Sequence, residues 1–284
     1  MKTTLACRLF FILFFVSIQA QEKMGGLALY TVRDDMAKNV YTTLHTISKI
    51  GYRYIEAAGY EEGQFYEMSP TEFCDLLGAL ELHPMSTHQG TVTFENAEKM
   101  MLDVKTVGFE YFVIPVPPMG MFTYDPKHNK MGMKRGNVKL ADILTKLGKM
   151  AHEAGLKLLY HNHDFEFMPD AEGAIPIDYL LEHCDTKYVN FQMDLLWVTK
   201  AGADPLAYFE KYPGRFKSWH VKDMDNTGKF APVGKGTIDF GRFLAEKEKS
   251  GMEFYLVEQD MCFDLEPLNA IQISHKGLIK FGFK

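Results

Sequence analysis

The chain has 284 residues, of which 46% are hydrophobic and 24% are charged, and its formal net charge at pH 7 is −6. These fractions are typical of a globular protein and exclude a disordered tail, a collagen-like rod and a polytopic membrane protein. The mild acidity argues against a nucleic-acid partner, because proteins that bind nucleic acid usually carry a basic face.

The first 20 residues have the three parts of a secretory signal peptide. Lys2 and Arg8 give a basic start, the apolar run LFFILFFV follows at 9–16, and Ala20 ends a short segment suited to cleavage. The apolar run is shorter than the roughly 20 residues that cross a bilayer, so we expect no stable membrane anchor. The sequence therefore predicts a signal peptide over 1–20, a domain over 21–284, and a secreted or periplasmic location.

Cysteines are few in the predicted domain. Cys74, Cys184 and Cys262 are an odd and widely spaced set, which does not indicate a disulfide framework. We expect each to pack as a small apolar side chain, although one bridge is left open. No pair of these residues has the close spacing of a structural zinc site.

Beyond residue 20, short apolar runs alternate with longer segments of helical character. The expected strands cover 27–32, 52–57, 83–88, 111–116, 157–163, 189–195, 216–221 and 254–259. The expected helices cover 39–50, a segment opened by Ser69-Pro70, 94–107, 137–154, a segment opened by Asp204-Pro205, 239–250, and a last segment from about 267. Glycines follow many of these helices, as helix ends prefer.

The repeated order of strand and helix predicts parallel βαβ units. Eight such units in a chain of this length fit a single (β/α)8 TIM barrel, an α/β fold, better than an open sheet. The longest irregular piece, 117–135, follows the fourth strand. It is expected on the catalytic face of the barrel, either as a lid or as a packing loop.

Chemistry in such a barrel lies at the carboxyl ends of the strands. Asp194, His220 and Glu258 end the sixth, seventh and eighth expected strands. Because polar groups in the mouth of a closed barrel are costly unless they bind something, these three predict a ligand site. A mixed nitrogen and oxygen donor set suits one divalent ion such as Mn, Co, Mg or Zn.

The fifth strand offers three candidates for a fourth ligand. His161 and His163 share one face of the strand, since side chains alternate. Glu166 lies beyond the regular strand, so alternation cannot place it. The residue pattern alone leaves all three open.

Several strand ends also carry a family resemblance. The chain resembles the xylose isomerase-like TIM barrel superfamily, in its sugar phosphate isomerase/epimerase group. The segments that carry the resemblance span most of the predicted domain: LYTVRD at 29–34, YIEAAG at 54–59, YHNHDFEF at 160–167, MDLLWV at 193–198, WHVKD at 219–223 and VEQD at 257–260.

The resemblance implies one divalent metal held by four residues from strands five to eight. In the ketose epimerase branch these are Glu, Asp, His and Glu, and the last three fall on Asp194, His220 and Glu258. The first falls on His161, so either His161 binds as a nitrogen ligand or Glu166 reaches in. We predict the ligands His161, Asp194, His220 and Glu258. The HNHDFEF string is also similar to inosose dehydratase-like and 3-keto-sugar-processing members.

The chemistry shared by these relatives is removal of a proton next to a sugar carbonyl. Glu258 is expected to serve as both ligand and base, with His163 or Glu166 as the second acid/base group. Four further residues at strand ends are expected to bind sugar hydroxyls: Glu56, His88, Lys222 and Arg33.

An exported enzyme rarely meets sugar phosphates, so the predicted signal peptide favours an unphosphorylated sugar or keto-sugar. The sequence shows no clear phosphate-binding motif, since Gly234-Lys235-Gly236 is a short string of low specificity. Three hypotheses follow: a metal-dependent sugar isomerase or epimerase, a lyase or hydratase acting on a 3-keto-sugar or its glycal, and a non-catalytic carbohydrate-binding barrel. A homo-oligomer is compatible with each.

Overall fold

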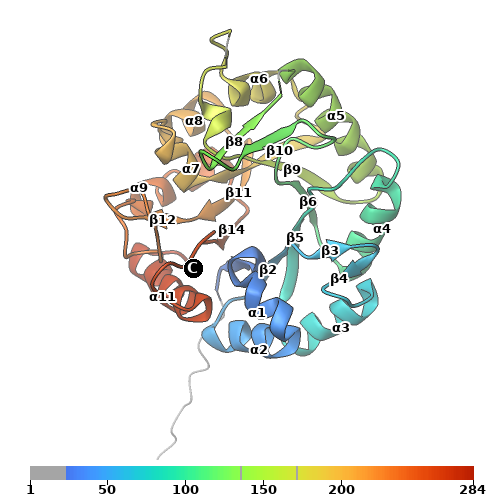
Figure 1. Cartoon of the computed structure of the whole chain (residues 1–284), viewed down its shortest axis with the longest axis vertical. Coiled ribbons are helices and arrows are strands. Elements are labelled where there is room, and N and C mark those ends of the chain that lie inside the picture. The colour runs from blue at the N-terminus through green and yellow to red at the C-terminus, as the bar shows by residue number, and fades with distance from the viewer. Residues whose placement is uncertain (1–23, 135, 171) are drawn as a thin grey trace, which may run out of the picture.

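A computed structural model describes residues 24–134, 136–170 and 172–284. Eight parallel strands close into a barrel in the order β1-β14-β11-β10-β9-β6-β5-β2, and helices surround it (Figure 1). This confirms the predicted single (β/α)8 barrel. The barrel strands are β1 (Gly26–Ala28), β2 (Tyr54–Ala57), β5 (His83–His88), β6 (Tyr111–Ile114), β9 (Lys157–His161), β10 (Val189–Asp194), β11 (Phe216–Val221) and β14 (Phe254–Val257).

The surrounding helices pack their apolar faces on the outward side chains of the strands. They are α1 (Arg33–Lys38), α2 (Val40–Ile50), α3 (Pro70–Ala79), α4 (Ala97–Val107), α5 (Asn137–Glu153), α6 (Pro176–His183), α7 (Leu195–Lys200), α8 (Pro205–Lys211), α9 (Phe240–Leu244), α10 (Lys247–Ser250) and α11 (Pro267–Phe281). Within the described ranges, no helix combines the length and the apolar character that a bilayer span requires.

Local signals explain where the helices begin and end. Ser69 and Glu72 form a complete capping box at the start of α3, so two otherwise unpaired amides are satisfied. Asn39 caps α2 by accepting a hydrogen bond from the amide of Thr42. Gly51 ends α2 with a φ of +113°, a conformation that favours glycine.

Several predicted bounds differ from the structure. The first strand ends at Ala28, because residues Leu29–Val32 form a 3-10 helix (η1) that leads into α1. The expected helix over 239–250 is divided into α9 and α10. Three hairpins were not predicted: β3 (Tyr60–Glu61) with β4 (Gln64–Phe65), β7 (Phe122–Asp125) with β8 (Lys130–Met133), and β12 (Asp223–Met224) with β13 (Phe230–Ala231).

The segment expected to be irregular, 117–135, therefore contains an antiparallel hairpin. Its base packs near the second 3-10 helix, η2 (Phe165–Phe167), where the rings of Phe122 and Phe165 lie 6.3 Å apart. Its tip is exposed, with Tyr124 among the more exposed large side chains. The hairpin thus stands beside the end of β9 at the barrel mouth.

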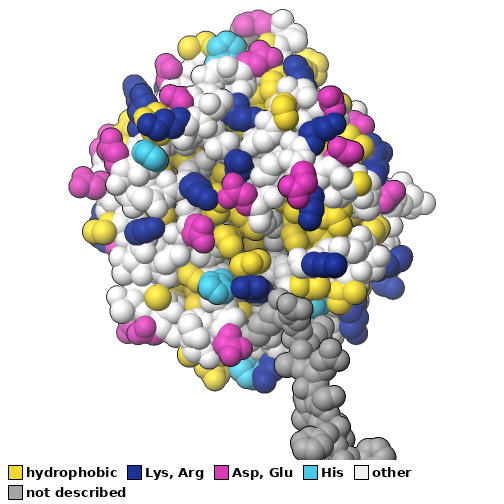
Figure 2. Space-filling model, turned by 180° about the vertical axis from the view of Figure 1, so that it is seen from behind, with side chains coloured by type: hydrophobic (Ala, Val, Ile, Leu, Met, Phe, Trp, Pro, Cys, Tyr) yellow, Lys and Arg dark blue, Asp and Glu magenta, His cyan; other side chains and the backbone are white. Residues whose placement is uncertain are grey.

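The barrel interior has two layers. Tyr111, Val113, Leu159, Phe254 and Leu256 fill the end nearer the strand starts and form an apolar cluster of their own. Polar side chains occupy the end nearer the strand carboxyl termini. On the outer surface, Lys and Arg are interspersed with Asp and Glu over the face in Figure 2. The three described cysteines are all free.

Candidate functional site

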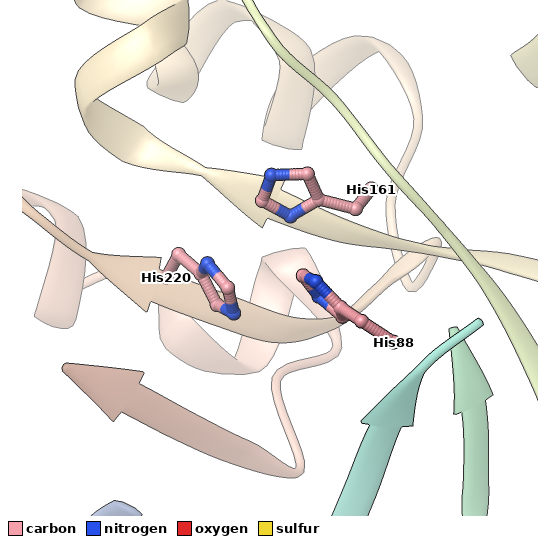
Figure 3. Close-up of side chains that lie close together, drawn as sticks. All are labelled: His88, His161 and His220. Atoms are coloured by element: carbon pink, nitrogen blue, oxygen red, sulfur yellow. The ribbon is translucent and has the colours of Figure 1, made fainter. Parts of the chain in front are cut away.

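The candidate site lies at the carboxyl end of the barrel, where strands far apart in the sequence bring polar side chains together. Figure 3 shows His88, His161 and His220 projecting toward one another from three strands. The ring centroids of His161 and His220 are 4.7 Å apart, and those of His88 and His220 are 5.5 Å apart. The predicted alternation of side chains on β9 and β11 is the reason that these rings point inward.

Four polar side chains at this end of the barrel form a compact group of candidate metal ligands. His161, Asp194, His220 and Glu258 are all buried, and one nitrogen or oxygen atom from each lies within 4.8 Å of the others. They come from β9, from the end of β10, from β11 and from the residue after β14. The structure therefore brings together the four residues that the sequence nominated.

His220 is oriented by a carboxylate on the opposite side of the barrel. Its Nε2 lies 2.7 Å from Oε1 of Glu56, and its Nδ1 lies 2.9 Å from Oε2 of Glu258 and 3.9 Å from Oδ2 of Asp194. Burial lowers the pKa of His220, but Glu258 and Glu56 outweigh burial and raise it to about 10. Nδ1 thus faces the ligand group while Glu56 fixes the ring.

Glu56 is itself held by three strands. Its Oε2 accepts hydrogen bonds from the hydroxyl of Ser86 and from the side-chain amide of Gln192, both at 2.7 Å. His88 Nε2 lies 3.1 Å from its Oε1. Burial raises the pKa of Glu56, but the charges and hydrogen bonds of His88 and His220 lower it far below its usual value. Glu56 is therefore a charged carboxylate inside the barrel.

His161 is a neutral imidazole with one nitrogen already engaged. Its Nδ1 lies 3.0 Å from Oε1 of Gln192, which leaves Nε2 for another partner. Burial, together with the neighbouring His220 and His163, lowers the pKa of His161 well below the usual value. The neutral form is the one that binds a metal ion.

Asp194 uses its two oxygens differently. Its Oδ1 accepts the amide of Trp197 and so caps α7, which fixes the carboxylate at the end of β10. Its Oδ2 lies 2.9 Å from the ammonium of Lys222 and 3.9 Å from Nδ1 of His220. One oxygen of a fully buried carboxylate is thus directed at the ligand group.

Lys222 is a fully buried ammonium among carboxylates. Its Nζ lies 2.7 Å from Oε2 of Glu258 and 3.0 Å from Oδ2 of Asp260, besides its contact with Asp194. Burial lowers its pKa, but Asp194, Asp260 and Glu258 raise it well above the usual value. Because a buried carboxylate group needs a counter-charge, Lys222 stabilises the site in its charged form.

His163 stands at the edge of the ligand group with a free nitrogen. Its ring centroid is 5.0 Å from that of His161 and 5.6 Å from that of Trp197. Its Nδ1 is buried and has no hydrogen-bond partner among the described residues. Burial, followed by the charge of Lys222, lowers the pKa of His163 to about 3, so the ring is neutral.

Two nominated residues lie apart from this group. Glu166 is fully buried, but its carboxylate accepts hydrogen bonds from the hydroxyl of Tyr160 at 2.7 Å and from the amide of His163 at 2.8 Å. Burial raises the pKa of Glu166 to about 8. Arg33 is exposed at the rim, where its guanidinium donates to the carbonyl oxygens of Tyr30 and Asp260. Neither side chain is among the candidate ligands.

Three residues of the network were not nominated from the sequence. Gln192 links His161, His88 and Glu56, Ser86 holds Glu56, and Asp260 pairs with Lys222. Each lies two residues from a nominated side chain. Alternation along β5 and β10 was therefore a signal that could have found Ser86 and Gln192, whereas Asp260 lies beyond β14, where alternation cannot place it.

The glycine string 234–236 does not offer free amides to a phosphate. The amides of Gly234 and Gly236 donate to Oδ2 of Asp223, at 3.0 and 2.9 Å. The amides of Met224 and Ile238 donate to Oδ1 of the same carboxylate, at 2.9 and 3.2 Å. An internal carboxylate thus occupies the place that an anion would need.

With this geometry in view, the comparison with known proteins identifies the family. The sequence profile described as xylose isomerase-like TIM barrel matches residues 44–261. The chain belongs to this family. The resemblance inferred from the strand ends is therefore confirmed.

Curated relatives within the family are inosose dehydratases. The chain is 31% identical to that of Clostridium beijerinckii over 129 residues, which cover 45% of this chain and 40% of the relative. It is 29% identical to that of Bacillus cereus over 143 residues, covering 43% of this chain and 47% of the relative. The chain therefore matches less than half the length of these curated relatives.

Solved structures confirm the fold over nearly the whole chain. A sugar phosphate isomerase/epimerase from Parabacteroides distasonis superposes with a TM-score of 0.74 and 22% identity, covering 91% of this chain and 98% of that one. The IolI protein, solved with a bound zinc atom, superposes with a TM-score of 0.66 and 17% identity, covering 91% and 97%. At these identities the likeness concerns the fold.

The relatives contradict one prediction. The secreted or periplasmic location inferred from residues 1–20 is wrong on this comparison, because the matched proteins are inosose dehydratases, which typically work in the cytoplasm. The predicted signal peptide and its boundary after Ala20 lie outside the described residues. The argument that export implies an unphosphorylated substrate therefore no longer holds.

Proposed function

We propose that the protein is an enzyme that removes a proton from the carbon next to the carbonyl group of a neutral sugar or keto-sugar, with one divalent metal ion as cofactor. The observation that carries the proposal is the buried group of His161, Asp194, His220 and Glu258, with the neutral ring of His163 beside it. A charged ligand group next to an unpaired base is the arrangement that this chemistry needs.

The four residues fit a metal ion by their own geometry. Nδ1 of His220 faces the group while Nε2 is held by Glu56, and Nδ1 of His161 is held by Gln192 while Nε2 remains. A metal-binding histidine usually shows this pattern, with its second nitrogen fixed by a carboxylate or amide. The zinc atom in the IolI neighbour supports a divalent ion, and the mixed donor set suits Mn, Co, Mg or Zn.

The bound ion would supply Lewis acidity at the substrate oxygens. His163 accepts the proton from carbon at Nδ1, which has no other partner among the residues described. The electron pair of the broken C–H bond moves onto the carbonyl oxygen and gives an enediolate. The ammonium of Lys222 lies in the same buried group as Asp194 and Glu258 and contributes positive charge near that oxygen.

The remaining nominated residues hold this arrangement. Glu56 orients His220, and Nε2 of His88 lies 3.0 Å from Oε1 of Gln192. Glu56 and His88 are proposed to line the part of the barrel mouth that faces substrate hydroxyls. Glu166 acts as a positioning residue because it bonds the backbone amide of His163 and ties it to Tyr160. Arg33 stands at the rim and is proposed to meet only the outer part of a substrate.

The proton transfer can lead to a lyase reaction or to an isomerase or epimerase reaction. If a hydroxyl on the next carbon leaves and takes up the proton, one water is lost, and the matched inosose dehydratases favour this lyase reaction. If the proton returns to another carbon or to the opposite face, the product is an isomer or epimer, as the names of the structural neighbours indicate for those proteins. The internal use of the 234–236 amides by Asp223 supports an unphosphorylated substrate in either case.

The deciding experiment is incubation of the metal-loaded protein with inososes and keto-hexoses in deuterated water. Loss of water supports the lyase, and solvent deuterium on carbon without loss of water supports the isomerase or epimerase. If neither change occurs with any keto-sugar, the proposal is refuted and a carbohydrate-binding barrel remains.

Metal content measured on Asp194→Ala and His220→Ala tests the ligand set, with Tyr124→Phe on the exposed β7–β8 hairpin as control. Full metal content in both alanine variants would refute the ligand assignment.

A further inference from the structure

A hollow opens at the rim of the barrel, next to the ends of β2 and β5. It has a volume of about 890 Å³ and lies between the β3–β4 hairpin and the segment that runs from β5 into α4. Ala58, Tyr60, Gln64, Tyr66, Thr91 and Lys99 are among the residues that line it. Volumes of this size accommodate small organic ligands.

The hairpin that forms one wall is built with backbone strain. Glu62 and Gly63 make its first two-residue turn, with φ of +49° and +88°. A second tight turn follows at Tyr66 and Glu67, closed by two hydrogen bonds between Phe65 and Met68, and both central residues have positive φ, +51° and +66°. Such turns normally contain Asn or Gly, and each other residue costs about 1 kcal/mol or more. Backbone strain of this kind is common at active sites and ligand-binding sites.

The side chain that the strained turn presents is Tyr66. Its backbone amide donates to the carbonyl of Gly59 at 2.9 Å, and its hydroxyl oxygen accepts the amide of Ala58 at 3.0 Å. Gly59 is needed for this approach, because a Cβ there would collide with the Tyr66 ring. The ring therefore packs closely against the backbone of Ala58 and Gly59, which follow β2.

Tyr66 joins the wall of the hollow to the backbone that follows β2, the strand that carries Glu56. Ala58, whose amide donates to the hydroxyl oxygen of Tyr66, is two residues after Glu56. Burial raises the pKa of Tyr66, and the charge of Glu56 adds to this effect. Because the phenol oxygen already accepts a backbone amide, its hydrogen is directed elsewhere and is available to an oxygen of a ligand. The residue thus connects the polar lining of the barrel to the wall of the hollow.

The chemistry of the lining favours a neutral, hydroxyl-rich ligand. Glu61, Glu62 and Glu67 line the hollow and supply carboxylate acceptors for hydroxyl groups. The one lining ammonium, that of Lys99, is paired with Asp103 at 2.6 Å, and Asp103 also accepts the hydroxyl of Tyr60. Carboxylates repel an anionic ligand, whereas tyrosine rings pack against the C–H face of a sugar.

We propose that this hollow is a second subsite, which binds a further neutral sugar ring linked to the sugar in the barrel mouth. The inference rests on the proposed function in that it takes the mouth to be the site of the reacting sugar. The natural substrate class is then a neutral glycoside whose two rings lie on either side of Tyr66.

The test compares the affinities of methyl β-glucoside and cellobiose for the metal-loaded protein, measured by calorimetric titration. Cellobiose is expected to bind about tenfold more tightly, because its second ring reaches the hollow. Tyr66→Ala and Gln64→Trp should bring this ratio close to one, the first by removing the aromatic wall and the second by filling the hollow. Tyr124→Ala, the same change on the other rim hairpin, should leave the ratio as it is.

The outcomes separate this proposal from the proposed function. Equal affinities for the two ligands, or no measurable binding of cellobiose, overturn the subsite even if a keto-sugar monomer is turned over. A cellobiose preference that depends on Tyr66 supports the subsite even if no keto-sugar is turned over. A disaccharide whose second ring carries a carboxylate should bind more weakly than cellobiose, and equal or tighter binding would contradict the proposed neutral ligand.

Discussion

The same eight strands build two very different halves of the barrel interior. The half nearer the strand starts is filled by Tyr111, Val113, Leu159, Phe254 and Leu256. The half nearer the strand ends holds charged and polar side chains, nearly all without access to solvent. On β14 and β9 the change occurs within two residues, from Leu256 to Glu258 and from Leu159 to His161.

The difference shows what each half contributes. Burial of an apolar side chain stabilises the fold by about 1.5–3 kcal/mol, whereas a buried charge costs free energy unless it is paired. The apolar half can therefore hold the barrel closed and leave the polar half free to serve chemistry. Gly26 shows how closely the apolar half is packed, because a Cβ at this position would collide with Leu256.

The largest effect is expected from the base in the polar half. His163→Gln should lower kcat by about 10²–10⁴-fold, because it removes the imidazole whose Nδ1 has no hydrogen-bond partner among the described residues. Metal content should be unchanged, since His163 is not among the four ligands. Steady-state kinetics and metal analysis on the same preparation check both statements. Activity close to that of the wild type would assign the base elsewhere.

The apolar half should respond in stability instead. Leu256→Ala should lower the free energy of unfolding by about 2–5 kcal/mol, because it leaves a cavity in the lower layer. Activity per folded molecule should change little. Denaturant unfolding measures the first effect, and Leu102→Ala on exposed α4 provides a matched control with a change of less than about 0.5 kcal/mol. A selective loss of activity in the Leu256 variant would contradict the division into two halves.

A smaller effect is expected from the carboxylate that orients His220. Glu56→Gln keeps the shape but weakens the contact with Nε2, so metal affinity should fall by about 10–100-fold. Glu253→Gln makes the same change at the other end of the barrel, where Glu253 pairs with Lys157 and accepts the hydroxyl of Tyr111. Competition titration with a chelator should show unchanged affinity in that control. Equal losses in both variants would mean that the effect is not local.

The smallest effect concerns the rim of the polar half. Gly59→Ala forces the Tyr66 ring to move and should cost about 1–3 kcal/mol of stability. Metal affinity should stay within about twofold, because the ligand group lies on other strands. Thermal unfolding and metal titration measure the two quantities. Loss of metal from this variant would show that the hairpin supports the ligand group directly.

Local patterns in the sequence predicted the barrel because each strand and most helix ends carry their own signals. Alternation on β9 correctly separated His161 from Tyr160, and spacing on β11 placed His220 and Lys222 on one side. What local patterns could not predict are contacts between distant strands. The hydrogen bond from Gln192 to Glu56 joins residues 136 positions apart. The choice between His161 and Glu166 depended on contacts that side-chain alternation does not describe, since Tyr160 and the His163 amide, six and three residues before Glu166, hold it away from the cluster.

The rim hairpins were missed for a different reason. Their strands have two to four residues, and the turns of the β3–β4 segment use Glu-Gly and Tyr-Glu in place of the usual Asn-Gly. The β3–β4 segment therefore offers neither a periodic pattern nor the usual turn signal. The segments that escaped prediction are those that border the mouth of the barrel.

The ammonium of Lys222 also affects how the protein folds before a metal ion binds. Three carboxylates gather around it, and its positive charge offsets part of their mutual repulsion within the chain. We therefore expect a newly made chain to close its barrel without an external cation. If the proposed ion is the cofactor, assembly of the protein and supply of the ion are then separate events, and a shortage of the ion is expected to leave an inactive but folded protein.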